Sequence, residues 1–153
     1  MVDTGDEFGA GFDATAAARR ARKFRVLIVE DNIDAADALA VLVQLLGHSA
    51  DVAYDGRGAL EALERIRPDV MLIDIGLPDI DGFEVARRAR LLPAGEKMLL
   101  AALSGYGQDG DKQRAREAGF DHHLTKPIEM DALTKLLGRA DRSEVENARQ
   151  TVH

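Results

Sequence analysis

Four short apolar runs limit what this chain of 153 residues can fold into. The runs cover Val26–Val29, Val70–Ile73, Met98–Leu103 and, more weakly, Phe120–Leu124. Between them lie segments in which apolar residues recur at helical spacing. Short apolar runs of this kind are typical of buried strands in a parallel sheet. With one more short strand expected at 49–54, five strands alternate with five helices. The sequence therefore predicts a doubly wound α/β domain with a five-stranded parallel sheet.

Capping and breaking residues predict where these elements begin and end. Asn32 or Asp34 can cap the first helix, and Gly47 suits the stop at its C-terminus. Pro68 and Pro93 end the second and third helices, because a proline disfavours helical geometry at the residue before it. The expected strands are 25–30, 49–54, 70–74, 98–103 and 120–124, and the expected helices are 32–46, 57–67, 83–92, 108–118 and 129–137.

The composition suits one domain with tails and excludes several classes of protein. We expect a disordered N-terminal extension over residues 1–23, a domain over 24–138 and a charged C-terminal tail over 139–153. Without cysteine the chain can form neither disulfides nor zinc–thiolate sites. No apolar run reaches the roughly 18 residues of a membrane span, and the N-terminus does not resemble a secretory signal, so we expect a cytoplasmic protein. The net charge of −7 argues against a general nucleic-acid binder.

Polar residues follow the apolar runs: Glu30 and Asp31, then Asp74, Ser104 and Lys126. Because sites in parallel sheets form outside the carboxyl ends of the strands, these side chains should converge. Three carboxylates repel one another unless a cation neutralises them, and oxygen ligands favour Mg²⁺ or Mn²⁺. A carboxylate can also attack phosphorus to give an aspartyl-phosphate, with Lys126 supplying positive charge and Ser104 a hydrogen bond. The sequence therefore predicts a site for a divalent cation and a phosphoryl group.

These residues lie in motifs that resemble the response regulator receiver domain of two-component signalling. The matching stretches are VLIVEDN at 26–32, DVMLIDIGLPDIDG at 69–82, AALSG at 101–105 and LTKP at 124–127. The resemblance covers about residues 24–138 and implies a flavodoxin-like fold with strand order 2-1-3-4-5.

The resemblance also implies a role for each polar residue. Asp74 would be the phosphoacceptor, and Ser104 and Lys126 would contact the phosphoryl oxygens. The ligands of Mg²⁺ would be Asp31, Asp74 and the backbone carbonyl of Gly76 directly, and Glu30 through water. Such a domain catalyses only its own phosphorylation and dephosphorylation, so we do not expect an enzyme that acts on other substrates.

Position 123 departs from the family pattern. Receivers usually have Tyr or Phe three residues before the lysine, as a side chain that rotates on phosphorylation, and this chain has His123. An imidazole can still swing inward when Ser104 moves, and unlike a phenol it titrates near neutral pH. We therefore expect Ser104 and His123 to form the switch. The resemblance further implies a cis peptide bond between Lys126 and Pro127.

A Mg²⁺-dependent phosphohydrolase acting through an aspartyl-phosphate is the alternative function. Such a hydrolase would want a second acid two residues after the nucleophile, as general acid–base. This chain has Gly76 there, which favours the signalling module.

The resemblance implies that a histidine kinase or a histidine phosphotransfer protein donates the phosphoryl group. Only 16 residues follow Leu137, too few for a DNA-binding domain, so we expect no direct DNA binding and a downstream protein target that the sequence does not identify. The run 120–127 also resembles receivers of hybrid histidine kinases, which leaves open whether the domain stands alone or is related to those kinases.

Overall fold

The sheet is the one that the sequence predicts. The structure, a computed structural model, describes residues 23–105 and 109–151, with side chains over 23–105 and 112–140. Five parallel strands lie in the order β2-β1-β3-β4-β5. In chain order they are β1 Arg25–Val29, β2 Ser49–Ala53, β3 Val70–Asp74, β4 Leu99–Ser104 and β5 His122–Thr125. The predicted fold class and strand order 2-1-3-4-5 are confirmed.

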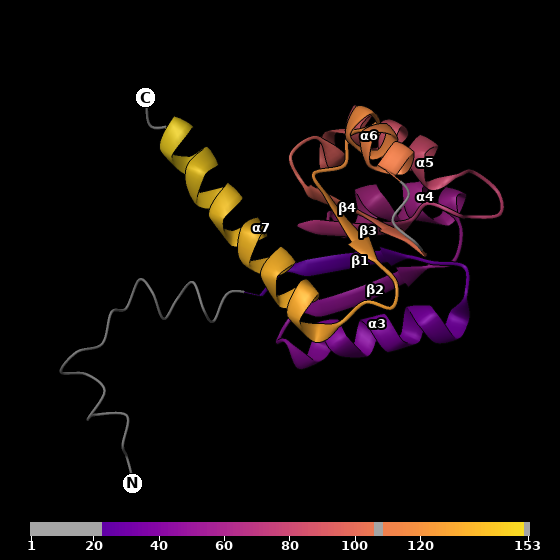
Figure 1. The fold of residues 1–153 in the computed structure, drawn as a ribbon. Helices are drawn as coiled ribbons and strands as arrows, with labels where there is room; N and C mark the ends of the chain where they lie inside the picture. The colour runs from indigo at the N-terminus through magenta and orange to yellow at the C-terminus, as the bar shows by residue number, and fades with distance from the viewer. Residues whose placement is uncertain (1–22, 106–108, 152–153) are drawn as a thin grey trace, which may run out of the picture.

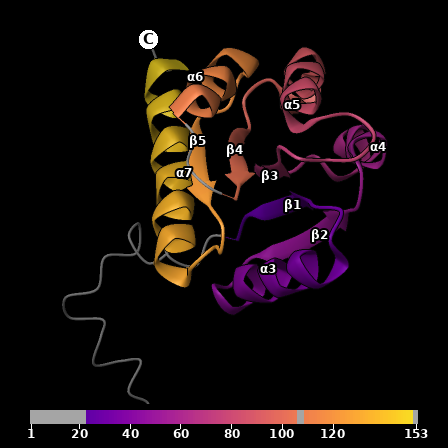
Figure 2. The ribbon, with the colours of Figure 1, turned by 45° about the vertical axis from the view of Figure 1, so that its right-hand side comes forward.

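Helices cover both faces of this sheet (Figure 1). They are α3 Ile33–Leu45, α4 Gly56–Ile66, α5 Gly82–Leu91, α6 Asp109–Ala118 and α7 Met130–Thr151, with a short 3-10 helix, η1 Pro93–Gly95. Buried residues of α4, α5 and α6 pack on one face of the sheet, and those of α3 and α7 pack on the other (Figure 2). The molecule is therefore a three-layer α/β/α sandwich, as alternating strands and helices predict.

The first helix begins and ends where its capping residues predict. The side chain of Asn32 accepts a hydrogen bond from the N–H of Ala35 at 2.9 Å, which satisfies one free donor of the first turn. At the other end Gly47 has φ +92°, and the N–H groups of Gly47 and His48 donate to carbonyls of the last turn. A residue without a Cβ adopts this left-handed geometry with least strain, so Gly47 ends α3.

The prediction for the last helix is wrong at its C-terminal end. We expected the helix to end at Leu137, whereas α7 continues to Thr151. Residues 139–151 contain neither glycine nor proline and are rich in residues with good helix propensity, so a segment that reads as a charged tail continues the helix. Residues 1–22 of the predicted N-terminal extension lie outside the described residues. The division of the chain into extension, domain and tail stays a prediction.

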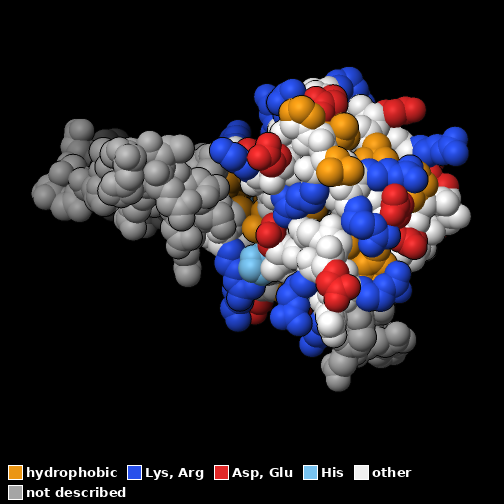
Figure 3. All heavy atoms as spheres, turned by 90° about the horizontal axis from the view of Figure 1, so that it is seen from above, with side chains coloured by type: hydrophobic (Ala, Val, Ile, Leu, Met, Phe, Trp, Pro, Cys, Tyr) orange, Lys and Arg blue, Asp and Glu red, His pale blue; other side chains and the backbone are white. Residues whose placement is uncertain are grey.

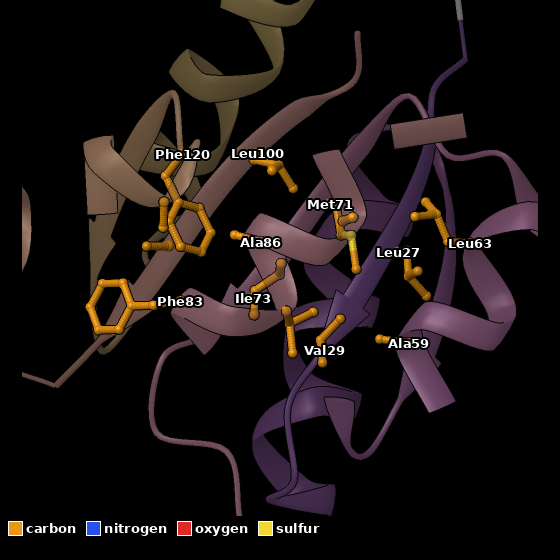
Figure 4. Packing of buried hydrophobic residues seen from close by; sticks show 14 of the residues in the cluster. Leu27, Val29, Ala59, Leu63, Met71, Ile73, Phe83, Ala86, Leu100 and Phe120 are labelled. Carbon is orange, nitrogen blue, oxygen red and sulfur yellow. The ribbon is translucent and has the colours of Figure 1, made fainter. Parts of the chain in front are cut away.

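The start of β5 is also later than predicted, at His122 instead of Phe120. Phe120 is buried, but its ring packs edge-on against Phe83 of α5, with centroids 6.4 Å apart (Figure 4). The carboxylate of Asp121 accepts from the N–H of Leu100 at 2.9 Å and pairs with Arg90 at 2.8 Å. These side-chain contacts, together with the hydrogen bond from the N–H of Asp121 to the carbonyl of Leu100, attach this segment to the domain before β5 begins.

Two hydrophobic layers hold the sheet between the helices. The layer under α4, α5 and α6 contains Leu27, Met71 and Leu100 from the central strands, together with Leu63 of α4 (Figure 4). Alternate residues of the same strands point to the other face and pack on α3 and α7. All five residues of β3 are buried, because this strand is covered on both faces.

The register of the strands aligns their carboxyl ends. Ile73 pairs with Val29 of β1 and Ala102 of β4, and Ser104 pairs with Thr125 of β5. The polar residues that follow these strands therefore lie along one edge of the sheet.

On the face over α5 and α6, Lys and Arg side chains alternate with acidic ones and with small hydrophobic areas (Figure 3). No helix within the described ranges combines the length and the apolar composition needed to cross a membrane.

Candidate phosphoacceptor and metal site

Three carboxylates gather at the carboxyl edge of the sheet. Glu30 and Asp31 follow β1, and Asp74 is the last residue of β3. One carboxylate oxygen from each lies within 4.8 Å of the others, and no His or Cys belongs to this group. Glu30 and Asp74 are buried, whereas Asp31 is exposed. The cluster thus has two fixed members inside the fold and one at the surface.

Lys126, just beyond β5, reaches both buried carboxylates. Its Nζ donates to Oε1 of Glu30 at 2.5 Å and to Oδ2 of Asp74 at 3.1 Å. These ion pairs join residues that are 96 and 52 positions apart in the chain, so the strand order, rather than local sequence, brings them together. The predicted cis bond between Lys126 and Pro127 is present.

The electrostatics of the cluster keep Asp74 ionised. Burial by itself would raise the pKa of Asp74, but the Gly76 N–H, the Glu30 carboxyl and the Lys126 ammonium together hold that pKa below its usual value. Burial raises the pKa of Glu30, and the neighbouring Asp74 adds to this effect. The pKa of Lys126 lies above its usual value, because its two ion pairs outweigh the cost of burying its charge. Asp74 is thus the carboxylate of the pair whose ionised form is favoured, and the lysine beside it stays protonated.

Ser104, the last residue of β4, is buried next to β5. Its Oγ lies 2.6 Å from Nε2 of His123, a hydrogen-bonding distance, and its carbonyl accepts from the N–H of Lys126 at 2.7 Å. The two residues predicted to form the switch are therefore in direct contact. Through its backbone, Ser104 also fixes the residue that carries the site's ammonium group.

The structure brings the predicted residues to one edge in two linked groups. Glu30, Asp31, Asp74 and Lys126 form the first, and Gly76 joins it through its N–H, which donates to Oδ1 of Asp74 at 2.9 Å. The second group is Ser104 with His123. The roles that the resemblance implies for these side chains stay predictions.

Sequence reasoning missed one residue of the loop that follows Asp74. The carboxylate of Asp79 accepts hydrogen bonds from the N–H groups of Gly56 and Arg57, at the start of α4. The sequence contained a weak signal, since an aspartate after Pro78 is a residue that bonds to free backbone donors. The donors lie more than 20 positions earlier in the chain, so no local pattern identifies them.

The donor set fits a hard divalent cation. Three carboxylates face one ammonium group, which leaves excess negative charge at a partly buried position. Oxygen ligands of this number and type suit Mg²⁺ or Mn²⁺ better than a soft transition metal. An acidic cluster with an ionised aspartate and a neighbouring lysine is consistent with a Mg²⁺-binding phosphoacceptor site.

Comparison with known proteins agrees with this geometry. The family model of the response regulator receiver domain matches residues 26–138. An uncharacterized 14.6 kDa protein of Leptolyngbya boryana is 37% identical over 112 residues, which cover 73% of this chain and 86% of that protein. The gliding motility regulatory protein of Myxococcus xanthus is 37% identical over 106 residues, 69% of this chain but only 14% of that protein. Several further relatives are about half covered by the match.

Solved structures share the fold. The chemotaxis response regulator CheY4 of Vibrio cholerae has a TM-score of 0.73 at 28% identity, over 78% of this chain and 99% of that chain. The receiver domain of the sensor histidine kinase PA1611 of Pseudomonas aeruginosa, which has a magnesium ion in its active-site cleft, has a TM-score of 0.72 at 29% identity, over 78% and 98%. The family match, the strand order and the acidic edge lead to one conclusion: this chain belongs to the response regulator receiver domains of two-component signal transduction.

Proposed function

We propose that this protein is a phosphoacceptor module in which Asp74 takes a phosphoryl group from a histidine kinase or a histidine phosphotransfer protein. The observation that carries the proposal is the position of Asp74, an ionised carboxylate 3.1 Å from the Lys126 ammonium and within one acidic cluster with Glu30 and Asp31. Receiver domains as a family are phosphorylated by histidine kinases.

In this reaction an oxygen of the Asp74 carboxylate attacks the phosphorus of a phosphohistidine. The P–N bond breaks, its electron pair leaves on the imidazole nitrogen, and an acyl phosphate forms on Asp74. Lys126 holds positive charge beside the incoming oxygens, and Ser104 offers a hydroxyl at the same edge of the sheet.

Glu30, Asp31, Asp74 and the carbonyl of Gly76 would hold Mg²⁺ or Mn²⁺, and the bound ion would offset the negative charge of the phosphoryl oxygens. The magnesium ion in the receiver domain of PA1611 supports this assignment. We also propose that the protein works in the cytoplasm and passes its signal to another protein, without binding DNA itself.

The test is labelling by a phosphoryl donor. Asp74→Asn keeps the shape of the side chain and removes the nucleophile, so acetyl phosphate or a kinase should label the wild type and leave this variant unlabelled. Asp51→Asn, which changes an exposed aspartate of β2, is the matched control and should be labelled normally. Equal labelling of the wild type and Asp74→Asn would refute the assignment.

The alternative, a phosphohydrolase, predicts turnover of a generic phosphomonoester. Gly76 offers no side chain that could act as the general acid two residues after Asp74, and Gly76 uses its N–H to hold Oδ1 of that carboxylate. We therefore expect the protein to hydrolyse a generic phosphomonoester no faster than Asp74 itself becomes phosphorylated.

A further inference from the structure

The loop between β3 and α5 carries Gly76 and returns close to its own start. At its far end the N–H of Gly82 donates to the carbonyl of Ile75 at 3.2 Å. A Cβ at position 82 would lie 2.5 Å from Cα of Ile75 and 2.6 Å from the carbonyl oxygen of Asp74. Only glycine allows this approach, so the end of the loop is held directly against the end of β3.

The middle of the loop is attached to a different element. Oδ1 of Asp79 accepts from the N–H of Gly56 at 2.9 Å, and Oδ2 accepts from the N–H of Arg57 at 3.1 Å. These donors are the first two N–H groups of α4, which lies beside the loop (Figure 2). The hydrogen bond from Gly56, with the bond from Arg57 and others, holds the pKa of Asp79 at about 2, so the carboxylate stays charged.

The contact between the loop and α4 is also sterically close. A Cβ on Gly56 would lie 2.8 Å from Cγ2 of Val85 and 3.1 Å from Cβ of Ile80. The start of α4 therefore packs directly against the residue that follows Asp79. A polar and a steric contact thus hold the loop at the same point.

We propose that Asp79 is a positioning residue for the metal site, because it ties the Gly76 loop to the start of α4 before a cation binds. The inference rests on the proposed function, in which Gly76 supplies a carbonyl ligand. Gly76 already donates to Oδ1 of Asp74 at 2.9 Å, so its placement also sets the orientation of that carboxylate. A loop that is ordered in advance does not lose conformational entropy when the ion binds, whereas a loose loop does.

A purely structural role for Asp79, as a cap of α4, is separable from this one. Asp55 is the N-cap residue of the same helix, and its Oδ1 accepts from the N–H of Gly58 at 2.7 Å. The two carboxylates therefore satisfy neighbouring donors of one helical turn. Of these two carboxylates, only Asp79 comes from the loop that carries Gly76, so Asp55 is its matched control.

The experiment compares Asp79→Ala, Asp79→Asn and Asp55→Ala in the full chain. Calorimetric titration with Mg²⁺ gives the dissociation constant, thermal unfolding gives Tm, and amide hydrogen exchange gives the order of residues 75–82. Both alanine variants should lower Tm, since each removes a cap. Asp79→Ala should also weaken Mg²⁺ binding by roughly tenfold or more, as other changes behind metal ligands do, and should speed exchange in 75–82. Asp79→Asn keeps one acceptor oxygen and should lie between Asp79→Ala and the wild type.

The control gives each outcome a meaning. Asp55→Ala should bind Mg²⁺ with wild-type affinity and leave exchange in 75–82 unchanged. Equal weakening of Mg²⁺ binding by Asp79→Ala and Asp55→Ala would reduce Asp79 to a helix cap, and unchanged affinity in Asp79→Ala would overturn the inference outright. A wild-type protein that does not bind Mg²⁺ would overturn the proposed metal site itself, and the positioning role with it.

Discussion

Asp31 is the surface member of the acidic cluster, whereas Glu30 and Asp74 are buried and paired with Lys126. Its carboxylate is thus the one most available to a cation from solvent. We predict that Asp31→Ala lowers the affinity for Mg²⁺ by more than about tenfold. Mutation of residues that only hydrogen-bond to metal ligands already lowers metal affinity by about that factor. A metal titration measures the loss, and Asp34→Ala, which removes an exposed carboxylate from the first turn of α3, should change it little. Phosphorylation that continues unchanged in excess chelator would contradict the metal requirement.

The contact between His123 and Ser104 should change when Asp74 is phosphorylated. The 2.6 Å distance between Oγ of Ser104 and Nε2 of His123 must change if the hydroxyl turns to the phosphoryl group. We predict that beryllofluoride, a phosphoryl mimic, shifts the imidazole resonances of His123 and alters their dependence on pH. In Ser104→Ala the mimic should no longer affect these resonances. Identical His123 titrations with and without the mimic in the wild type would show that this residue does not report the switch.

At the scale of elements, the ends of β4 and β5 should respond together. The N–H of Lys126 donates to the carbonyl of Ser104 at 2.7 Å, and the side chain of Lys126 reaches Asp74. A ligand shifts a conformational equilibrium only through contacts that differ between the two states, and a phosphoryl group on Asp74 changes both residues' contacts. We therefore predict altered hydrogen exchange over residues 104–127 on addition of beryllofluoride, and a smaller change in Lys126→Met. A change confined to residues 74–82 would refute this coupling.

At the same scale, sequence patterns predicted the central strand better than the end of the last helix. Continuous apolar runs occur only where a strand is covered on both faces, so β3 coincides with its prediction. The continuation of α7 to Thr151 has no apolar run to mark it, because the segment past Ala140 is mostly polar. Helix propensity is a weak guide compared with packing, which explains why the sequence pattern predicts a charged tail where the structure has a helix.

At the scale of the whole molecule, we expect His48 to make the free energy of unfolding depend on pH. Its Nδ1 accepts from the N–H of Phe24 at 3.0 Å, and its ring stacks on the Phe24 ring. Burial lowers the pKa of His48, with the Asp69 carboxylate opposing the shift. A depressed pKa means that the stabilisation is present above the usual histidine value and is lost as pH falls through the lower, folded value.

We therefore predict that protonation of His48 lowers the free energy of unfolding by about 1 kcal/mol as pH drops from about 7 to about 5. This is about the net contribution of one hydrogen bond. Denaturant unfolding of the wild type and of His48→Asn measures the effect. The Asn side chain offers an acceptor oxygen near the position of Nδ1 but does not titrate, so its curve should depend less on pH. Parallel curves for the two proteins would contradict the role of His48.

The sequence by itself determined the fold class and the set of polar residues at the carboxyl edge. Alternation of apolar runs with helical spacing has one common solution, a covered parallel sheet, and in such a sheet Asp31, Asp74 and Ser104 must end up near one another. These conclusions depend on periodicity and chain order, which a sequence contains in full.

Only the tertiary structure decided which partner each polar group takes. Lys126 pairs with Glu30 across 96 positions, Ser104 bonds to His123, and Asp79 holds the start of α4. Each of these contacts requires atoms from separate elements to lie within hydrogen-bonding distance. A hydrogen bond weakens when that distance grows by a few tenths of an ångström. That precision comes from the register of the strands and from close packing at Gly56 and Gly82, where a single Cβ would push the elements apart.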